Sequence, residues 1–319
     1  LILFTTSCLA NMIGLNLSAG LNSVITIYII IPFILVPQLL FSGFTVNYDK
    51  LHKIWRNPVH VPVIGDMMTS RWAYEALAVD QFKDNKYTRN FFAEDMIKSN
   101  AAYDEFVLDQ VKVTLNNSFY EFRKDSTYDL SNSFRMIKAE LSELTDRGVI
   151  DPFVDLDKLM PLQFNDQVFR TVLHYLAREK KKIASVKRAA MDRSDSIYKN
   201  LLEELGGEDN YLMFKDAHVN DKLEEYLTNE YSEIAIIVDN RFVRKKGLIY
   251  MPPDSRFGRA HFYAPLKKLG SLTIDTYLFN FLFIWVTSLL FYLALVFDVL
   301  RRLVNWGEKV KLRKKLRIR

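Results

Sequence analysis

Cysteine is nearly absent from this sequence, since Cys8 is the only one among 319 residues. An intrachain disulfide is therefore excluded, and any water-soluble domain has to be held together by its hydrophobic core. The sequence also lacks a Gly-x4-Gly-Lys-(Ser/Thr) phosphate loop, a zinc-ligand spacing and a nucleophile elbow. We therefore predict no catalytic, cofactor-binding or metal-binding residue, and we expect this chain not to be an enzyme by itself.

Charged residues are missing from long stretches near both ends. Asn22–Val46 has no charge in 25 residues, Leu278–Val296 has none in 19, and Leu1–Gly20 is uncharged as well. At 1.5 Å per residue the first two runs extend about 37 and 28 Å as helices, against a hydrocarbon core of about 30 Å. We predict spanning helices at residues 22–46 and 272–298. Residues 1–20 are interpreted as the end of a further spanning helix, in a chain cut from a longer protein.

Positive charge is concentrated beyond the last predicted span. Residues 301–319 contain nine basic residues and one acidic residue, whereas residues 1–300 contain 34 basic and 37 acidic ones. Basic residues next to a span mark the cytoplasmic side and favour anionic lipid, and no nucleic-acid-binding motif accompanies them. We therefore predict a multi-pass protein of the inner or plasma membrane, with the 299–319 tail cytoplasmic and residues 50–270 extracytoplasmic. Nucleic acid is not expected as a partner.

The region between the two long apolar runs has the pattern of a helical domain. Apolar residues recur at helical spacing between about 91 and 245, so the predicted fold class is all-α, a polytopic helical membrane protein. An α-helix-rich extracytoplasmic domain, residues 86–270, is inserted between the last two spans, after a loop and helix at residues 47–85. Asp151-Pro152 and Gly206-Gly207 predict breaks between short helices, with Gly206-Gly207 as a C-cap. Ile234–Val238 fits a helix or a strand.

The predicted 22–46 span contains two prolines, and the loop after it contains a predicted helix cap. Pro32 and Pro37 each remove a backbone donor, so this helix is expected to kink and to pack against more helices than this chain supplies. Asp66 is predicted to cap a helix that runs to about Phe82.

Four short motifs follow one another in this part of the chain. They are Asn16-Leu17-Ser18-Ala19-Gly20, Phe41-Ser42-Gly43-Phe44, Arg71-Trp72-Ala73-Tyr74-Glu75-Ala76-Leu77 and Asp80-Gln81-Phe82. In this order they resemble the fifth spanning helix, the turn before it and the re-entrant helix after it in the White (ABCG-like) subfamily of ATP-binding-cassette transporters. The layout is also similar: a fifth helix, an external region, a sixth helix and a short basic tail. The external region is much longer here than in typical members.

This resemblance implies the C-terminal part of an ABC type-2 permease domain. It implies ATP-driven export of a lipophilic or lipid-like substrate, with a second transporter half that forms a homo- or heterodimer. ATP and Mg are expected at a nucleotide-binding domain that lies before Leu1 or on another subunit. The resemblance places an apolar plug at Phe44 and Thr45, where Thr45 is less apolar than the usual residue. Phe33, Leu40 and Phe41 either line the transport path or only pack.

Glu75 is the carboxylate of most interest, because an acid at membrane depth is costly and is a functional candidate by default. Arg71 lies one turn earlier, so an i,i+4 ion pair with a structural role is the competing interpretation.

A second functional class also fits the layout. A two-helix anchored protein whose helical external domain regulates polysaccharide chain length has end helices, a proline-bearing span and no cysteines. That class predicts long, uninterrupted external helices, whereas the breaks at Asp151-Pro152 and Gly206-Gly207 predict short ones. On this ground the transporter is the preferred hypothesis.

Overall fold

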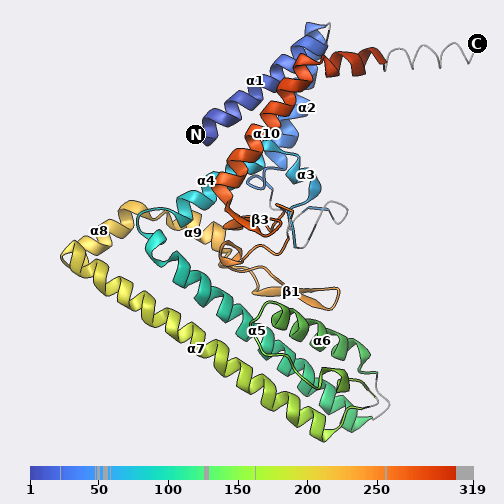
Figure 1. The fold of residues 1–319 in the computed structure, drawn as a ribbon, viewed down its shortest axis with the longest axis vertical. Helices are drawn as coiled ribbons and strands as arrows, with labels where there is room; N and C mark the ends of the chain where they lie inside the picture. The colour runs from blue at the N-terminus through green and yellow to red at the C-terminus, as the bar shows by residue number, and fades with distance from the viewer. Residues whose placement is uncertain are drawn as a thin grey trace, which may run out of the picture. The chain divides into compact units, whose positions relative to one another are not determined.

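The computed structural model describes residues 1–21, 23–46, 48, 51, 52, 57, 59–125, 129–161, 163–255 and 257–306. The first residue of the predicted 22–46 span and residues 307–319 of the predicted basic tail lie outside these ranges. The chain divides into two compact units (Figure 1). Unit 1 comprises Leu1–Gln81 and Pro252–Arg319, and unit 2 comprises Phe82–Met251. Residues 252–270, which the sequence assigned to the external domain, therefore belong to unit 1.

Unit 1 contains apolar helices, a short helix, a longer helix and one hairpin. Its elements are α1 (Ile2–Gly20), α2 (Val24–Leu40), α3 (Val63–Asp66), α4 (Thr69–Lys83), β3 (Leu266–Leu269), β4 (Leu272–Asp275) and α10 (Thr276–Val296). Strands β3 and β4 pair antiparallel, and Asp275 caps α10 by accepting from the backbone N–H of Tyr277 at 2.9 Å. The predicted last span therefore begins at Thr276 rather than 272, because residues 272–275 form β4.

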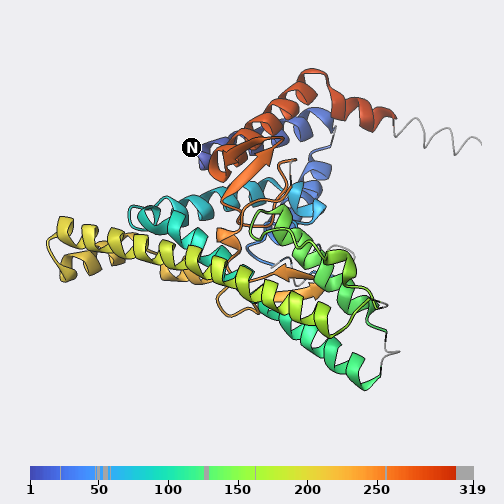
Figure 2. The same cartoon turned by 60° about the horizontal axis from the view of Figure 1, so that its bottom comes forward.

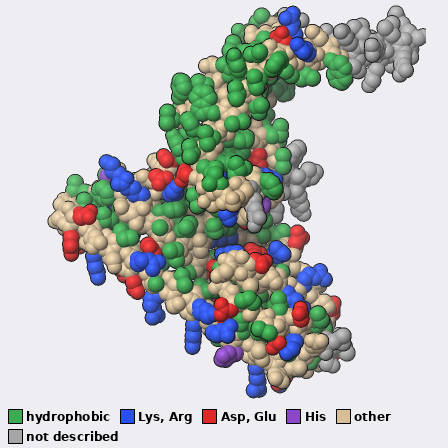
Figure 3. Space-filling view, viewed as in Figure 1, with side chains coloured by type: hydrophobic (Ala, Val, Ile, Leu, Met, Phe, Trp, Pro, Cys, Tyr) green, Lys and Arg blue, Asp and Glu red, His purple; other side chains and the backbone are tan. Residues whose placement is uncertain are grey.

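Helices α1 and α10 lie side by side and run in the same direction (Figures 1 and 2). Asn16 on α1 donates to the backbone carbonyl of Phe291 on α10 at 2.9 Å, and one turn later Gly20 lies against Leu300. Both helices are long and apolar enough to cross a membrane, and at most 22% of either one's most apolar stretch is buried. The core helix of a soluble protein is mostly buried. Figure 3 shows the resulting apolar surface over this helical part of unit 1.

Helix α2 is shorter than predicted, and none of its side chains is buried. Its 17 residues end at Leu40 because Ser42 and Gly43 form a turn. Pro32 and Pro37 lie inside it, so the carbonyls of Tyr28 and Phe33 lose their usual helical donors. The prediction that Asp66 caps the next helix is wrong. Asp66 ends α3, and α4 starts three residues later at Thr69.

Unit 2 is mostly helical and contains two unusually long helices. Its elements are α5 (Thr88–Lys124), α6 (Ser131–Asp146), η2 (Leu156–Lys158), α7 (Asp166–Leu205), α8 (Glu208–His218), α9 (Asp221–Thr228), β1 (Ala235–Val238), β2 (Arg241–Arg244) and η3 (Leu248–Tyr250). The expectation of short helices is wrong, because α5 has 37 residues and α7 has 40. Asp151-Pro152 does break the chain between helices, and Gly206 caps α7 with φ 79°, as predicted.

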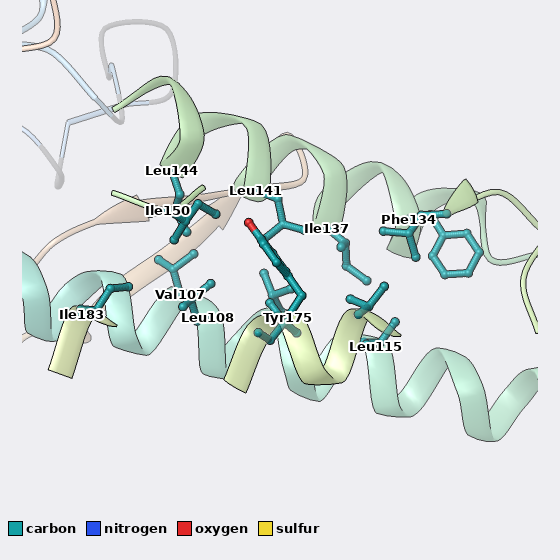
Figure 4. Close-up of a cluster of buried hydrophobic side chains, with 14 of the residues drawn as sticks. Val107, Leu108, Leu115, Phe134, Ile137, Leu141, Leu144, Ile150, Tyr175 and Ile183 are labelled. Atoms are coloured by element: carbon teal, nitrogen blue, oxygen red, sulfur yellow. The ribbon is translucent and has the colours of Figure 1, made fainter. Parts of the chain in front are cut away.

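The core of unit 2 lies between α5, α6 and α7 (Figure 4). Its fully buried side chains include Leu108 and Leu115 on α5, Ile137 and Leu141 on α6, and Val172 on α7. Helical spacing of these residues places them on one face of each helix, and burying these faces stabilises the three-helix packing.

Ion pairs fix the antiparallel register of the two long helices. Lys180 pairs with Asp109 at 2.6 Å, Lys187 with Glu105 at 2.8 Å and Arg193 with Glu94 at 2.8 Å. These pairs are partly exposed, so each stabilises weakly, but together they select one alignment.

The hairpin β1–β2 resolves the segment that the sequence left open. Ile234–Val238 contributes a strand, paired antiparallel to β2 through a turn at Asp239 and Asn240, both with positive φ. Arg244 at the end of β2 is buried and donates to Asn100 at 2.7 Å and Ser99 at 2.6 Å on α5. The fold is therefore mostly helical, as predicted, with two short hairpins that an all-α assignment omits.

Candidate functional site

A buried carboxylate in unit 1 is the centre of a polar cluster between α4, the β3–β4 hairpin and α10. Glu75 on α4 is fully buried, and so are its partners Lys267 on β3 and Asn280 on α10. Lys267 Nζ donates to Glu75 Oε1 at 2.8 Å, and Asn280 Nδ2 donates to Oε2 at 2.9 Å. The backbone N–H of Tyr263 donates to Oε1 at 3.2 Å. One carboxylate thus joins three segments that are far apart in the sequence.

Arg71 is a second cation beside Glu75. Its Nη1 lies 3.5 Å from Glu75 Oε2, so the i,i+4 ion pair considered from the sequence is present. Among the described residues, Arg71 Nε and Nη1 have no hydrogen-bond partner. The guanidinium instead lies 3.9 Å from the centre of the Trp72 ring, which is an attractive cation–π position.

Two cations beside one acid determine the protonation of the pair. Burial alone would raise the pKa of Glu75, but Arg71 and Lys267 hold it below its usual range. Burial lowers the pKa of Lys267 to about 8, against the opposing effect of Glu75. Each group thus favours the charged form of the other.

A second acid extends the cluster toward the loop before α4. Asp66 at the end of α3 lies 3.8 Å from Arg71 Nη2 and accepts from Arg259 Nε at 3.0 Å. Arg259 also donates to the carbonyl of Val61 at 2.8 Å. The charges alternate along Arg259, Asp66, Arg71, Glu75 and Lys267, which gives one continuous network with a net charge of +1. Because the inner members are desolvated, losing one of them leaves an uncompensated buried charge.

The end of α2 is attached to the start of α4 by polar contacts. Gln38 Oε1 accepts from the backbone N–H of Ser70 at 3.0 Å, and the Ser70 hydroxyl donates to the Gln38 carbonyl. A free helix-start donor and a helix-end carbonyl are thereby satisfied in one contact.

The Ser-Gly turn after α2 packs on the same part of unit 1. Ser42 donates to the Leu39 carbonyl at 2.8 Å, and Gly43 has φ 83°. A Cβ at position 43 would lie 2.5 Å from the Phe262 ring, so only glycine fits both the backbone and the space. The Phe44 ring meets Tyr74 of α4 edge-on, with ring centres 5.3 Å apart.

The predicted path and plug residues are not gathered into one site. Phe33 and Leu40 lie on α2 with exposed fractions of 75% and 41%, and Phe44 is 65% exposed. Thr45 is exposed in the turn, and Phe41 is half-buried at the C-cap of α2. Their roles in transport stay predictions.

Sequence reasoning missed two members of the cluster. Asn280 is an amide inside an otherwise apolar run, and such residues usually face other helices, so this signal was present. Lys267 lies in the basic segment before the last helix, where one buried lysine cannot be distinguished from exposed ones. Its pairing with Glu75 depends on a separation of 192 residues.

Unit 2 contains an open, acidic cavity of about 440 Å³ beside α9 and η3. Its lining includes Asp221, Glu224, Glu225, Glu230 and Lys246. Burial raises the pKa of Glu224, which the nearby Lys215 partly offsets. Among the described residues, no three His, Cys, Asp or Glu side chains are placed to hold a metal ion.

Comparison with known protein families shows that residues 1–80 match the ABC-2 type transporter family model. This range includes α1, α2, α3 and most of α4, and therefore Arg71 and Glu75. No curated protein and no solved structure matched the chain.

The match supports a membrane location and a role as the permease component of an ABC transporter, which in general works with an ATP-binding cassette component.

Proposed function

We propose that this chain is the C-terminal part of the permease domain of a White-like ABC exporter that carries a lipophilic or lipid-like substrate. The observation that carries the proposal is the ABC-2 match over residues 1–80, which coincides with the segment that holds the buried Arg71–Glu75 pair. ATP and Mg bind at a nucleotide-binding domain outside residues 1–319, either earlier in the same protein or on a separate subunit.

The arrangement of the three apolar helices supports the predicted orientation. Because α1 and α10 run in the same direction and α2 follows α1 directly, the Leu21 turn and Arg301 lie at the same end of the bundle. The basic residues from Arg301 onward favour a cytoplasmic location for this end. Because α2 and α10 each lead away from that end toward residues 41–275, these residues would then be extracytoplasmic.

Helix α2 supports a second transporter half as partner. No α2 side chain is buried, and two of its carbonyls lack their helical donors because of Pro32 and Pro37. Backbone acceptors within a bilayer are satisfied by neighbouring helices or by water in a cavity. Both surroundings exist where two halves meet around a transport path, and Phe33, Leu40 and Phe44 would face that path.

The glutamate–lysine cluster supports a mechanical role for α4. It links α4 to the external hairpin and to α10, so a movement of α10 driven from the cytoplasm is transmitted to α4 and to the turn at Phe44. The cluster keeps α4, the hairpin and α10 together, because separating its charges in a desolvated site is costly.

The chain-length regulator is a second candidate, and one observation now favours it. The 37- and 40-residue antiparallel helices of unit 2 have the length that this class predicts for its external domain. The transporter is preferred because the family match covers the membrane segment itself.

ATP hydrolysis distinguishes the two candidates. The full-length protein, purified from its native membrane with any bound subunit, is reconstituted in lipid nanodiscs, and Mg-ATP hydrolysis is measured with and without vanadate. The exporter predicts vanadate-sensitive hydrolysis that increases on addition of a lipid-like substrate. Absence of any ATPase in the same chain or complex would reject it. Phe44→Ala is expected to raise basal hydrolysis or leak, whereas Ile25→Ala at the other end of α2 leaves both unchanged.

A further inference from the structure

Residues 299–306 form a separate helix directly after α10. Asp298 has φ 49° and accepts, through its carbonyl, from the backbone N–H of Arg302 at 3.0 Å. This left-handed residue ends α10 and lets the chain turn. Figures 1 and 2 both show the short dark-red helix leaving the axis of α10 at a sharp angle. It therefore does not extend the span.

The two faces of this helix are cleanly separated. Successive residues of a helix are about 100° apart around its axis. On this basis the five apolar residues fall within one arc of roughly 160°, and the three polar residues occupy the opposite side. The apolar residues are Val299, Leu300, Leu303, Val304 and Trp306, and the polar ones are Arg301, Arg302 and Asn305.

Only part of this apolar face is buried against the rest of the protein. Leu300 is half-buried against the end of α1, where a Cβ at Gly20 would lie 2.6 Å from Leu300 Cγ. Leu303 and Trp306 are 57% and 67% exposed. The helix is thus attached at one edge to α1, and within the described residues Leu303 and Trp306 are left largely exposed.

We propose that residues 299–306 lie flat in the inner surface of the membrane and bind anionic lipid headgroups through Arg301 and Arg302. A short helix with an apolar face, a basic polar face and a tryptophan has the chemistry of an interfacial helix. The bilayer is the occupant that the structure indicates, because the helix begins two residues after an apolar span and is fixed to the end of a second one.

The positive charges of Arg301 and Arg302 favour binding to anionic lipid headgroups. The two arginines can extend their side chains toward phosphates while their methylene groups stay among the acyl chains. The sequence continues with seven more basic residues between 309 and 319, and one acidic residue, Glu308. Such a cluster is attracted to the anionic cytoplasmic leaflet. This inference rests on the proposed orientation but not on transport.

Site-specific labelling tests the proposal. In a Cys8→Ser background, which removes the single native thiol of residues 1–319, cysteines are introduced at Leu303 on the apolar face and Asn305 on the polar face. Each full-length variant is labelled with an environment-sensitive fluorophore and placed in nanodiscs of phosphatidylcholine, with or without phosphatidylglycerol. Quenching by a lipid-bound quencher is then measured.

The label at position 303 is expected to be quenched at least about threefold more than the label at 305 when the bilayer is anionic. Arg301→Gln/Arg302→Gln should remove most of this difference, as should omission of phosphatidylglycerol. Equal quenching at 303 and 305 in anionic bilayers, or quenching indifferent to anionic lipid, would overturn the proposal.

A label at Leu289→Cys in α10 distinguishes a failure of the surface-helix proposal from a failure of the transporter proposal. Strong quenching at 289 together with none at 303 rejects only the surface helix. Absence of quenching at 289 rejects the membrane embedding on which the transporter proposal depends.

Discussion

Lys267 on β3 donates to Glu75 on α4 across 2.8 Å, with both side chains fully excluded from solvent. The pair connects the β3–β4 hairpin to a helix within the region that matches ABC-2 type transporters. A buried ion pair contributes little net stability against an apolar replacement, but removing one partner leaves a charge uncompensated. The pair is therefore sensitive to single substitutions and tolerant of a matched double one.

Lys267→Met is expected to destabilise unit 1 by about 3–5 kcal/mol, because Glu75 loses its closest cation. Glu75→Gln/Lys267→Met should recover much of this loss. Thermal unfolding of the detergent-solubilised protein gives the order of stability. A double variant less stable than Lys267→Met would contradict the pairing.

Glu75→Gln alone separates function from packing. Glutamine retains an acceptor for Tyr263 and Lys267 but leaves two buried cations without their acid, so we expect a less stable protein whose folded fraction has reduced substrate-stimulated ATPase. Full transport activity in a folded Glu75→Gln protein would assign Glu75 a purely structural role.

Gly43→Ala tests the turn after α2. The substitution adds strain at φ 83° and a methyl group 2.5 Å from the Phe262 ring, for an expected cost of about 2–4 kcal/mol. Gly148→Ala is the matched control, since Gly148 has φ 70° and open space around it. It should lose only the backbone part, about 1–2 kcal/mol. Equal losses of stability at the two positions would show that the contact with Phe262 is unimportant.

Gly20→Val tests the contact that fixes the helix of residues 299–306. The added side chain collides with Leu300, so we expect a lower melting temperature and greater protease sensitivity near Arg301. Gly14→Val on the same helix meets nothing within 4 Å and serves as the control. Cleavage near Arg301 at the same rate in both variants would be evidence against the contact.

Glu140 makes unit 2 sensitive to pH. Burial raises the pKa of Glu140 to about 7, although the backbone N–H of Phe242 donates to it at 2.7 Å and lowers it in part. A folded-state pKa above the unfolded value of 4.5 means that the neutral acid is favoured in the fold. Stability from this group is thus fully present below pH 4.5 and is lost as the pH rises through about 7.

Glu140→Gln should remove this dependence and raise stability at pH 7 by about 2–3 kcal/mol, with little effect near pH 4.5. Urea unfolding followed by circular dichroism at both pH values gives the comparison, with exposed Glu203→Gln as control. A Glu140→Gln protein that is less stable than the native one at pH 7 would refute the assignment.

The sequence predicted the elements whose signal is local. Uncharged runs located α1 and α10, and Gly206 located the end of α7 because only a left-handed residue fits there. Prediction failed where distant contacts decide. The segment from Phe164 to Leu205 shows separate apolar stripes, yet α5 supplies apolar and acidic partners along it and one 40-residue helix results.

The candidate site was likewise predictable from the sequence only where the contact is local. Arg71 and Glu75 were accessible from their i,i+4 spacing, and the pair is present. Lys267 and Asn280 reach Glu75 only through the packing of β3 and α10 on α4, which no local pattern encodes.

Sidedness is the claim on which the transporter account depends most directly. In the Cys8→Ser background, single cysteines replace Ser196 on the exposed face of α7 and Asn305 after α10, and intact cells are treated with a membrane-impermeant thiol reagent. The account predicts labelling at position 196 in intact cells and at position 305 only after permeabilisation. Labelling at 305 in intact cells, with 196 protected until permeabilisation, would contradict it.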